Sequence, residues 1–246
     1  MQIIPAFVTQ NKCYQAGAPL TPRGIMLHSV GTPQPSAAVF ARSFNQYQPG
    51  GVSVCVHAFA QADGTVYQTL PWEMRGWHCG GSANSTHIGV EMTEPSAGMT
   101  RSEGAEQIAG TYHTAVELFA ALCKQYGLDP AQDGVIIGHA EGHRRGVASN
   151  HADPELLWRT YDMGYTMDGF RRDVAEAMKN GAREEALDMP RYDSVAEMPQ
   201  WARADAQRLI DRGALQGNTD GKLDVSEDML RTMIVCQRMV DEQKET

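Results

Sequence analysis

The chain has 246 residues, 42% of them hydrophobic, and a formal net charge of −9, which is typical of a globular protein with a sizeable core. The acidic balance disfavours nucleic acid and anionic membrane surfaces as partners, because both carry negative charge. No apolar run approaches the roughly 20 residues of a membrane span. The start, MQIIPAFVTQNK, has neither the basic start nor an apolar core long enough for a secretory signal, so we expect synthesis in the cytoplasm without a signal peptide.

Strands and helices alternate along the first part of the sequence. RGIMLH (23–28) predicts a strand, and SAAVFARSFNQYQ (36–48) predicts an amphipathic helix that Ser36 caps. VSVCVHAFAQADGTVYQTLP (52–71) predicts two strands joined by a tight Ala-Asp-Gly turn. HIGVEM (87–92) predicts a further strand.

The next segment carries apolar residues at three- and four-residue spacing. This pattern predicts a helix over 102–127, which Gly-Leu-Asp-Pro ends. DGVIIGH (133–139) predicts a strand, and DGFRRDVAEAMKNG (168–181) predicts a closing helix that ends at Gly181. The alternation, with one hairpin included, predicts an α/β fold with a mixed central β-sheet flanked by helices.

Three separated residues are candidate metal ligands. His28 and His139 each close a short aliphatic run, the pattern of a side chain presented at the end of a buried strand, and Asp153 lies in the polar loop HAEGHRRGVASNHADP. Two histidines and one carboxylate would leave a tetrahedral Zn²⁺ with one open position, as in zinc hydrolases. Glu91 ends a third strand that would reach the same side of the sheet. Taken singly, each histidine is also compatible with a hydrogen-bonded loop residue that binds no metal.

Five scattered cysteines without a CxxC pair suit reduced thiols. Cys79, in GWHCGG, offers an alternative nucleophile if His78 or His57 activates it. That alternative would leave Glu91 and the candidate ligands without a role.

The motifs GIMLHSVG, VCVHAFAQADGTVYQTLP, GWHCGGSAN, HIGVEM and IIGHAEG…SNHADPELLW occur in this order between about residues 23 and 158. Together they resemble the type-2 zinc N-acetylmuramoyl-L-alanine amidases, which include phage endolysins and peptidoglycan recognition proteins. The resemblance implies hydrolysis of the amide between N-acetylmuramic acid and L-alanine of peptidoglycan. The long loop before Asp153 is most similar to amidases of phages and prophages of Gram-positive bacteria, which implies action on the cell wall after release, during phage lysis.

The resemblance also implies roles for individual residues. His28, His139 and Asp153 fall on the three zinc ligands, and Glu91 falls on the acidic residue that helps to activate water. His151 stands where many members have a lysine that stabilises the oxyanion. Residues that border the substrate groove in the family correspond to His57, Trp77, His78 and Asn84.

The sequence predicts two domains. Residues 1–180 form the amidase domain and 181–196 a polar linker. Residues 197–246 form a small α-helical module of two amphipathic helices around a turn, which resembles one degenerate S-layer-homology repeat. Wall binding and self-association are both open for this module, as is simple packing of a helical pair.

Two rival functions differ in class from a lytic enzyme. A non-catalytic peptidoglycan-binding module would usually lack a zinc ligand, whereas all three positions here hold competent residues. A cytoplasmic amidase that recycles soluble muropeptides would keep the same catalytic set. The C-terminal module favours the whole wall as substrate.

Overall fold

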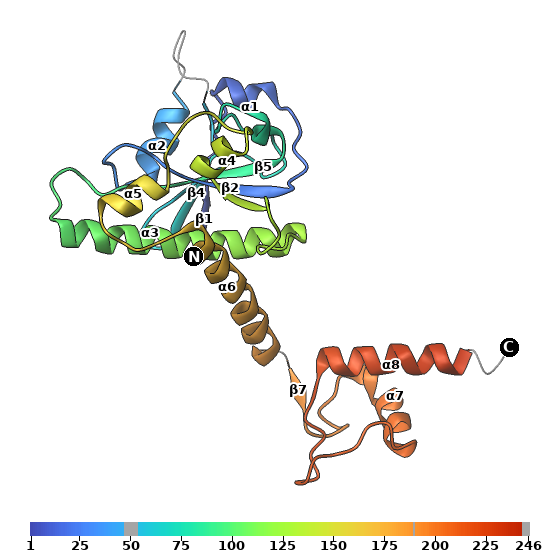
Figure 1. Cartoon of the computed structure of the whole chain (residues 1–246). Helices are drawn as coiled ribbons and strands as arrows, with labels where there is room; N and C mark the ends of the chain where they lie inside the picture. Colours follow the sequence, from blue (N-terminus) through green and yellow to red (C-terminus); the bar gives the residue numbers. More distant parts are fainter. Residues whose placement is uncertain (47–53, 189, 243–246) are drawn as a thin grey trace. The chain divides into compact units, whose positions relative to one another are not determined.

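The computed structural model describes residues 1–46, 54–188 and 190–242. The chain divides into two compact units, Met1–Lys179 and Asn180–Thr246, which are described separately below. The first unit contains a six-stranded sheet with strand order β1-β4-β3-β5-β2-β6 (Figure 1). Its strands are β1 (Gln2–Pro5), β2 (Gly24–Ser29), β3 (Ala58–Ala60), β4 (Thr65–Gln68), β5 (His87–Met92) and β6 (Ile136–Gly138).

The sheet is mixed, as the sequence predicted. Only β3 and β4 pair in antiparallel fashion, as the two arms of the predicted hairpin, and the other neighbouring pairs are parallel. Both hairpin strands are shorter than predicted, and residues 52 and 53 of the first lie outside the described residues. Because β2, β5 and β6 are parallel, their carboxyl ends meet at one edge of the sheet.

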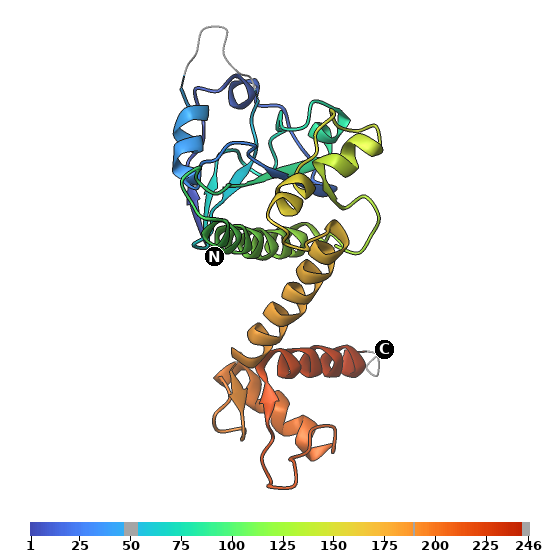
Figure 2. The same cartoon turned by 60° about the vertical axis from the view of Figure 1, so that its left-hand side comes forward.

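Side chains of each strand alternate between two differently covered faces. Ile25 and Leu27 of β2 belong to the main apolar core with residues of α3 (Arg101–Tyr126), whereas Met26 packs with Ile137 on the opposite face. In Figures 1 and 2, α3 (green) lies along one face and α2 (Ala37–Phe44) and α4 (His139–Arg144) lie on the other side. His28 shares the parity of Met26, so it faces away from α3.

The long helix α3 confirms the prediction for residues 102–127. Thr100 and Glu103 form a reciprocal capping box at its start, and Gly127 ends it with a φ of 62°, a left-handed conformation that favours glycine. Its apolar stripe buries Ile108, Leu118 and Phe119 completely. This stripe supplies most of the core on one face of the sheet.

Three helices differ from the sequence predictions. Helix α6 (Met167–Asp188) continues through Gly181, because one glycine costs a helix only about 1 kcal/mol and good helix formers follow it. The predicted helix over 36–48 is shorter, and Tyr47 and Gln48 lie outside the described residues. The polar segment HAEGHR, predicted as a loop, forms the short helix α4.

Helix α4 is stabilised by Glu141. The Glu141 carboxylate accepts a hydrogen bond from the Gly138 backbone N–H at 3.3 Å and pairs with both terminal nitrogens of Arg171, at 2.9 and 3.1 Å. Helix propensity depends on local sequence, so it does not include this contact with Arg171, which lies 30 residues away in the chain. Helices α1 (Lys12–Ala16) and α5 (Glu155–Thr160), the 3₁₀ turn η1 (Ser82–Ser85) and strand β1 were not predicted either.

The second unit has its own apolar core. Helices α7 (Gln200–Asp211) and α8 (Glu227–Glu242) pack together beside a two-stranded sheet of β7 (Arg191–Tyr192) and β8 (Val225–Ser226). Leu209 and Leu230 are among its buried residues, which agrees with the two predicted amphipathic helices. Among the described residues, no helix is long and apolar enough to cross a membrane.

We predict that residues 1–181 fold on their own. Phe170 and Val174 of α6 are fully buried in the core of the first unit, so a chain ending at residue 181 keeps that core. A chain ending at residue 166 loses both side chains, and removal of one buried phenylalanine ring already costs about 3–5 kcal/mol. Thermal unfolding should therefore show the full-length transition of the first unit in 1–181 and a lower or absent transition in 1–166. A clearly lowered transition in 1–181 would contradict the prediction.

Candidate metal centre

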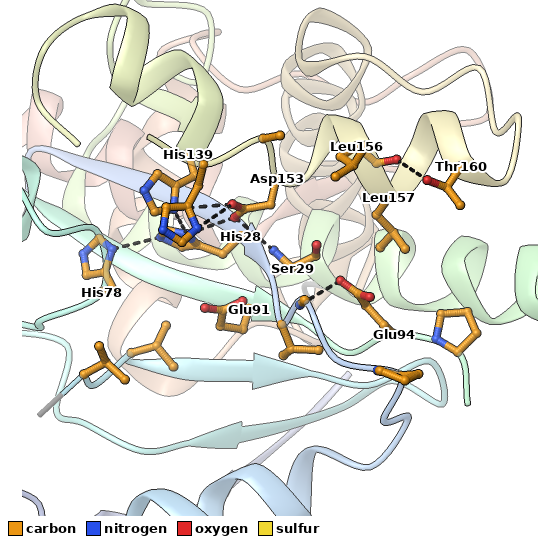
Figure 3. A pocket seen from close by; sticks show the side chains of 18 of the residues that line it. His28, Ser29, His78, Glu91, Glu94, His139, Asp153, Leu156, Leu157 and Thr160 are labelled. Carbon is orange, nitrogen blue, oxygen red and sulfur yellow. Dashed lines mark hydrogen bonds and ion pairs between the residues drawn. The ribbon is translucent and has the colours of Figure 1, made fainter. Parts of the chain in front are cut away.

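Three side chains from separate elements converge at the carboxyl edge of the sheet. His28 is the penultimate residue of β2, His139 is the first residue of α4, and Asp153 lies just before α5 (Figure 3). The two Nδ1 atoms lie 3.0 Å apart. Asp153 Oδ2 lies 3.3 Å from His28 Nδ1, and Asp153 Oδ1 lies 3.5 Å from His139 Nδ1.

These spacings fit a tetrahedral metal ion. Zinc bonds to nitrogen and oxygen of about 2.0–2.1 Å place the ligand atoms of a tetrahedron about 3.3–3.4 Å apart. The Nδ1–Nδ1 distance and the distances from the two Asp153 oxygens bracket this spacing. Each residue offers one donor atom, and these atoms all lie within 4.8 Å of one another. The structure thus brings together the three candidate ligands predicted from separated motifs.

The protonation states also suit metal binding, since ligands must be deprotonated. Burial lowers the pKa of His28, which favours the neutral imidazole. Burial acts to raise the pKa of Asp153, but the neighbouring His139 and His28 hold that pKa well below its usual range. The Ser29 backbone N–H also donates to Asp153 Oδ2 at 3.3 Å.

Glu91 lies beside this cluster. It is the register partner of His28 across the β2–β5 pair, so both side chains leave the same face of the sheet. Glu91 Oε2 is buried and has no hydrogen-bond partner among the described residues. Burial, followed by the charges of Asp153 and Glu94, raises the pKa of Glu91 well above its usual range. A buried carboxyl with a perturbed pKa in a cleft is typical of a functional group.

His151 lies on the solvent side of the cluster. Its side chain is 60% exposed, and its Nδ1 lies 3.8 Å from Asp153 Oδ1. The imidazole stacks on His139 with the ring centroids 4.5 Å apart. The ring lines the groove and is accessible to a ligand there.

The cluster opens into a groove of about 810 Å³. His28, Glu91, His139 and Asp153 line one part of it, and Glu94 and residues of α5 line another (Figure 3). His151 lines the same groove. Leu156, Leu157 and Thr160 of α5 supply apolar and hydroxyl surface that the sequence did not single out. A groove of this size accommodates a ligand much larger than a single amino acid.

The four predicted substrate-binding residues have different placements. Trp77, His78 and Asn84 line a smaller cavity of about 310 Å³. His78 also lines the main groove, and the two cavities share His139 and His151 as well. His57 lines neither cavity: it is fully buried, its Nε2 bonds the Met74 carbonyl at 2.7 Å, and its Nδ1 accepts from the Gly89 N–H at 3.0 Å. The structure therefore does not bring His57 to the groove.

The contacts of Asn84 and Cys79 stabilise the protein and do not indicate catalysis. Asn84 Oδ1 accepts from the backbone N–H groups of His78 and Cys79 at 2.9 and 3.0 Å, which orders the GWHCGG loop. Cys79 is buried, and burial raises the pKa of its thiol. A raised pKa disfavours the thiolate, so the alternative of a cysteine nucleophile is not supported.

Comparison with known proteins agrees with this geometry. The family model of N-acetylmuramoyl-L-alanine amidases, Amidase_2, matches residues 18–156, more than half of the chain. The chain belongs to this family. The matched segment contains His28, Glu91, His139, His151 and Asp153, and membership supports an amidase function directed at peptidoglycan. No curated protein sequence matches the chain.

Solved structures share the fold. The Staphylococcus aureus hydrolase AmiA in complex with its ligand is 20% identical with a TM-score of 0.59, and the match covers 75% of this chain and 86% of that chain. The catalytic domain of XlyA is 22% identical with a TM-score of 0.52, and a mutant endolysin from Bacillus subtilis is 21% identical with a TM-score of 0.53. Both matches cover 71% of this chain and 99% of the other. These likenesses confirm the predicted type-2 amidase fold.

We predict that His57 makes folding stability pH-dependent. Burial lowers its pKa to about 4, whereas the unfolded chain has a histidine pKa of about 6.5. Between these values the unfolded state binds more protons, so the free energy of unfolding is undiminished above about pH 6.5 and falls by up to roughly 3 kcal/mol as the pH drops towards 4. Urea unfolding should show a shallower pH dependence in His57→Gln, which lacks this titration. Parallel profiles for the two proteins would contradict the assignment.

Proposed function

We propose that the protein is a zinc-dependent N-acetylmuramoyl-L-alanine amidase that hydrolyses the amide between N-acetylmuramic acid and L-alanine in peptidoglycan. The observation that carries the proposal is the convergence of His28, His139 and Asp153 at tetrahedral spacing on the floor of a groove, within the segment that matches the family. Bound there, Zn²⁺ would supply a Lewis acid that polarises the scissile carbonyl and lowers the pKa of a water towards about 7.

Glu91 would act as the general base. Glu91 lines the groove, and its buried Oε2 has no hydrogen-bond partner among the described residues, so the carboxylate has an oxygen left to accept a proton from the attacking water. The raised pKa makes the carboxylate a stronger base than an exposed glutamate. The same group, once protonated, can pass the proton to the leaving nitrogen of L-alanine.

His151 would stabilise the developing oxyanion. Its exposed imidazole stands at the groove side of His139, where a ring N–H can donate to an oxygen of the substrate. Many members of the family carry a lysine at this position, and an imidazole supplies the donor without a permanent charge. Trp77 and His78 line the adjoining cavity, where a sugar or peptide could extend.

We further propose that the enzyme is a phage or prophage endolysin that acts on the cell wall after release. In this proposal residues 1–180 carry catalysis and residues 197–246 form a module for wall binding or self-association. The compact second unit with its own core is consistent with such a module. Tethering would raise the effective substrate concentration without changing the chemistry.

A paired assay separates this role from recycling of soluble muropeptides. The 1–181 chain should keep the full-length rate on soluble muropeptide and lose lysis of purified sacculi. Equal loss on both substrates would remove the targeting role of the second unit. Sacculi left intact by a full-length enzyme that cleaves soluble muropeptides would favour the recycling amidase.

We predict that the purified protein binds one equivalent of zinc per chain, and that His28→Ala and Asp153→Ala lose both metal and activity. Each substitution removes a ligand from a three-residue set, and no other carboxylate or imidazole belongs to the cluster among the described residues. Metal analysis and release of soluble muropeptide give the two readouts, with His113→Ala on the exposed face of α3 as the matched control. Full activity in a preparation free of metal would refute the mechanism.

We predict that Glu91→Gln and His151→Ala retain zinc but lower kcat by roughly 10² to 10³, the usual cost of a lost general base or oxyanion donor. Both residues lie beside the metal ligands and outside the set of converging donor atoms. Steady-state kinetics on soluble muropeptide, with zinc content measured on the same samples, provides the test. A wild-type kcat in either variant would remove that residue from the proposed machinery.

A further inference from the structure

Both metal-facing imidazoles are hydrogen-bonded on their far side. His28 Nε2 lies 2.9 Å from His78 Nδ1, and His139 Nε2 lies 3.2 Å from Ser149 Oγ. A neutral imidazole has one protonated nitrogen and one with a lone pair. The partner behind each ring therefore decides whether the lone pair or the proton faces the metal position.

In His78, the partner of His28, the donor and the acceptor nitrogen can be assigned. His78 Nε2 lies 3.1 Å from the backbone carbonyl of His87, and a carbonyl oxygen only accepts. In the neutral ring His78 Nε2 therefore carries the proton and His78 Nδ1 the lone pair. This lone pair requires a proton on His28 Nε2, which leaves the lone pair of His28 on Nδ1.

The partner of His139 leads to the same result. Ser149 Oγ lies 3.0 Å from the Cys79 carbonyl, and its single hydrogen must point there, because two acceptors would otherwise face each other. Ser149 Oγ then accepts from His139 Nε2–H. The lone pair of His139 is left on Nδ1, 3.0 Å from that of His28.

We propose that His78 and Ser149 are positioning residues that fix the Nε2–H tautomers of His28 and His139 and so direct both Nδ1 lone pairs, with the Asp153 carboxylate, at one cation. The inference rests on the proposed zinc site. Two lone pairs and a carboxylate at these distances repel one another unless a cation lies among them, so the network prepares the site for metal. Hydrogen bonds behind metal-binding histidines typically change metal affinity 10–100-fold.

The backbone around His78 is built to hold its ring. The His78 N–H donates to Asn84 Oδ1 at 2.9 Å. Gly89 of β5 lies directly against the ring, because a Cβ at this position would come within 2.5 Å of His78 Cγ. Both ring nitrogens are already engaged, so His78 contributes to the site through His28 more than through substrate.

The test compares zinc dissociation constants, measured by chelator competition, in a matched set of variants. His78→Ala removes the acceptor and should weaken zinc binding about 10–100-fold. His78→Asn should recover most of the affinity, because Asn Oδ1 can occupy the place of Nδ1 and accept from His28 Nε2–H. Ser149→Ala should also weaken binding, and it provides a second variant if His78→Ala does not fold. His113→Ala on the exposed face of α3 should leave the constant unchanged.

Long-range ¹H–¹⁵N spectra of the zinc-loaded protein give a second readout. The expected result is a proton on Nε2 of both His28 and His139. A proton on either Nδ1, an unchanged dissociation constant in His78→Ala, or equal losses in His78→Ala and His78→Asn would overturn the inference. Zinc binding with the expected tautomers but without muropeptide hydrolysis would instead contradict the proposed function alone, and a wild-type protein that binds no zinc would contradict both.

Discussion

The parallel pairing of β2 with β5 and β6 is the constraint on which the site depends. In this register His28 lies opposite Glu91, and Leu27 lies opposite Gly138, the residue before His139. A slip of one residue would turn every side chain of a strand to the other face. His28 would then point into the core beneath α3, and the cluster of candidate metal ligands would not form.

The register is in turn set by unequal burial of the two faces. Ile25, Leu27, Ile88 and Val90 point to the face covered by α3, where they join a continuous apolar core. The alternate positions carry His28 and Gly89, which suit a polar site and the close approach of His78. Apolar burial on one face therefore holds polar groups in position on the other.

Burial of several imidazoles and a carboxyl is costly unless each finds a partner. Carbonyl groups of Met74, His87 and Cys79 supply these partners directly or through His78 and Ser149. Glu91 is the exception, since its Oε2 has no partner among the described residues. An unpaired buried carboxyl beside a candidate metal centre is a cost to stability that function can explain.

The sequence by itself determined five of the six strands of the main sheet, the long helix α3, the mixed α/β class and the residue types of the candidate metal site, because periodicity and strand-end histidines are local signals. Only the tertiary structure decided that His57 is buried away from the groove, that His78 and Ser149 lie behind the ligands, and that α5 lines the groove. It also decided that α4 is helical, since Arg171 of α6 supports Glu141 from 30 residues away. Hydrogen bonds and ion pairs between distant segments leave no periodic trace in the chain, so sequence patterns identify candidate groups, and packing decides which of them meet.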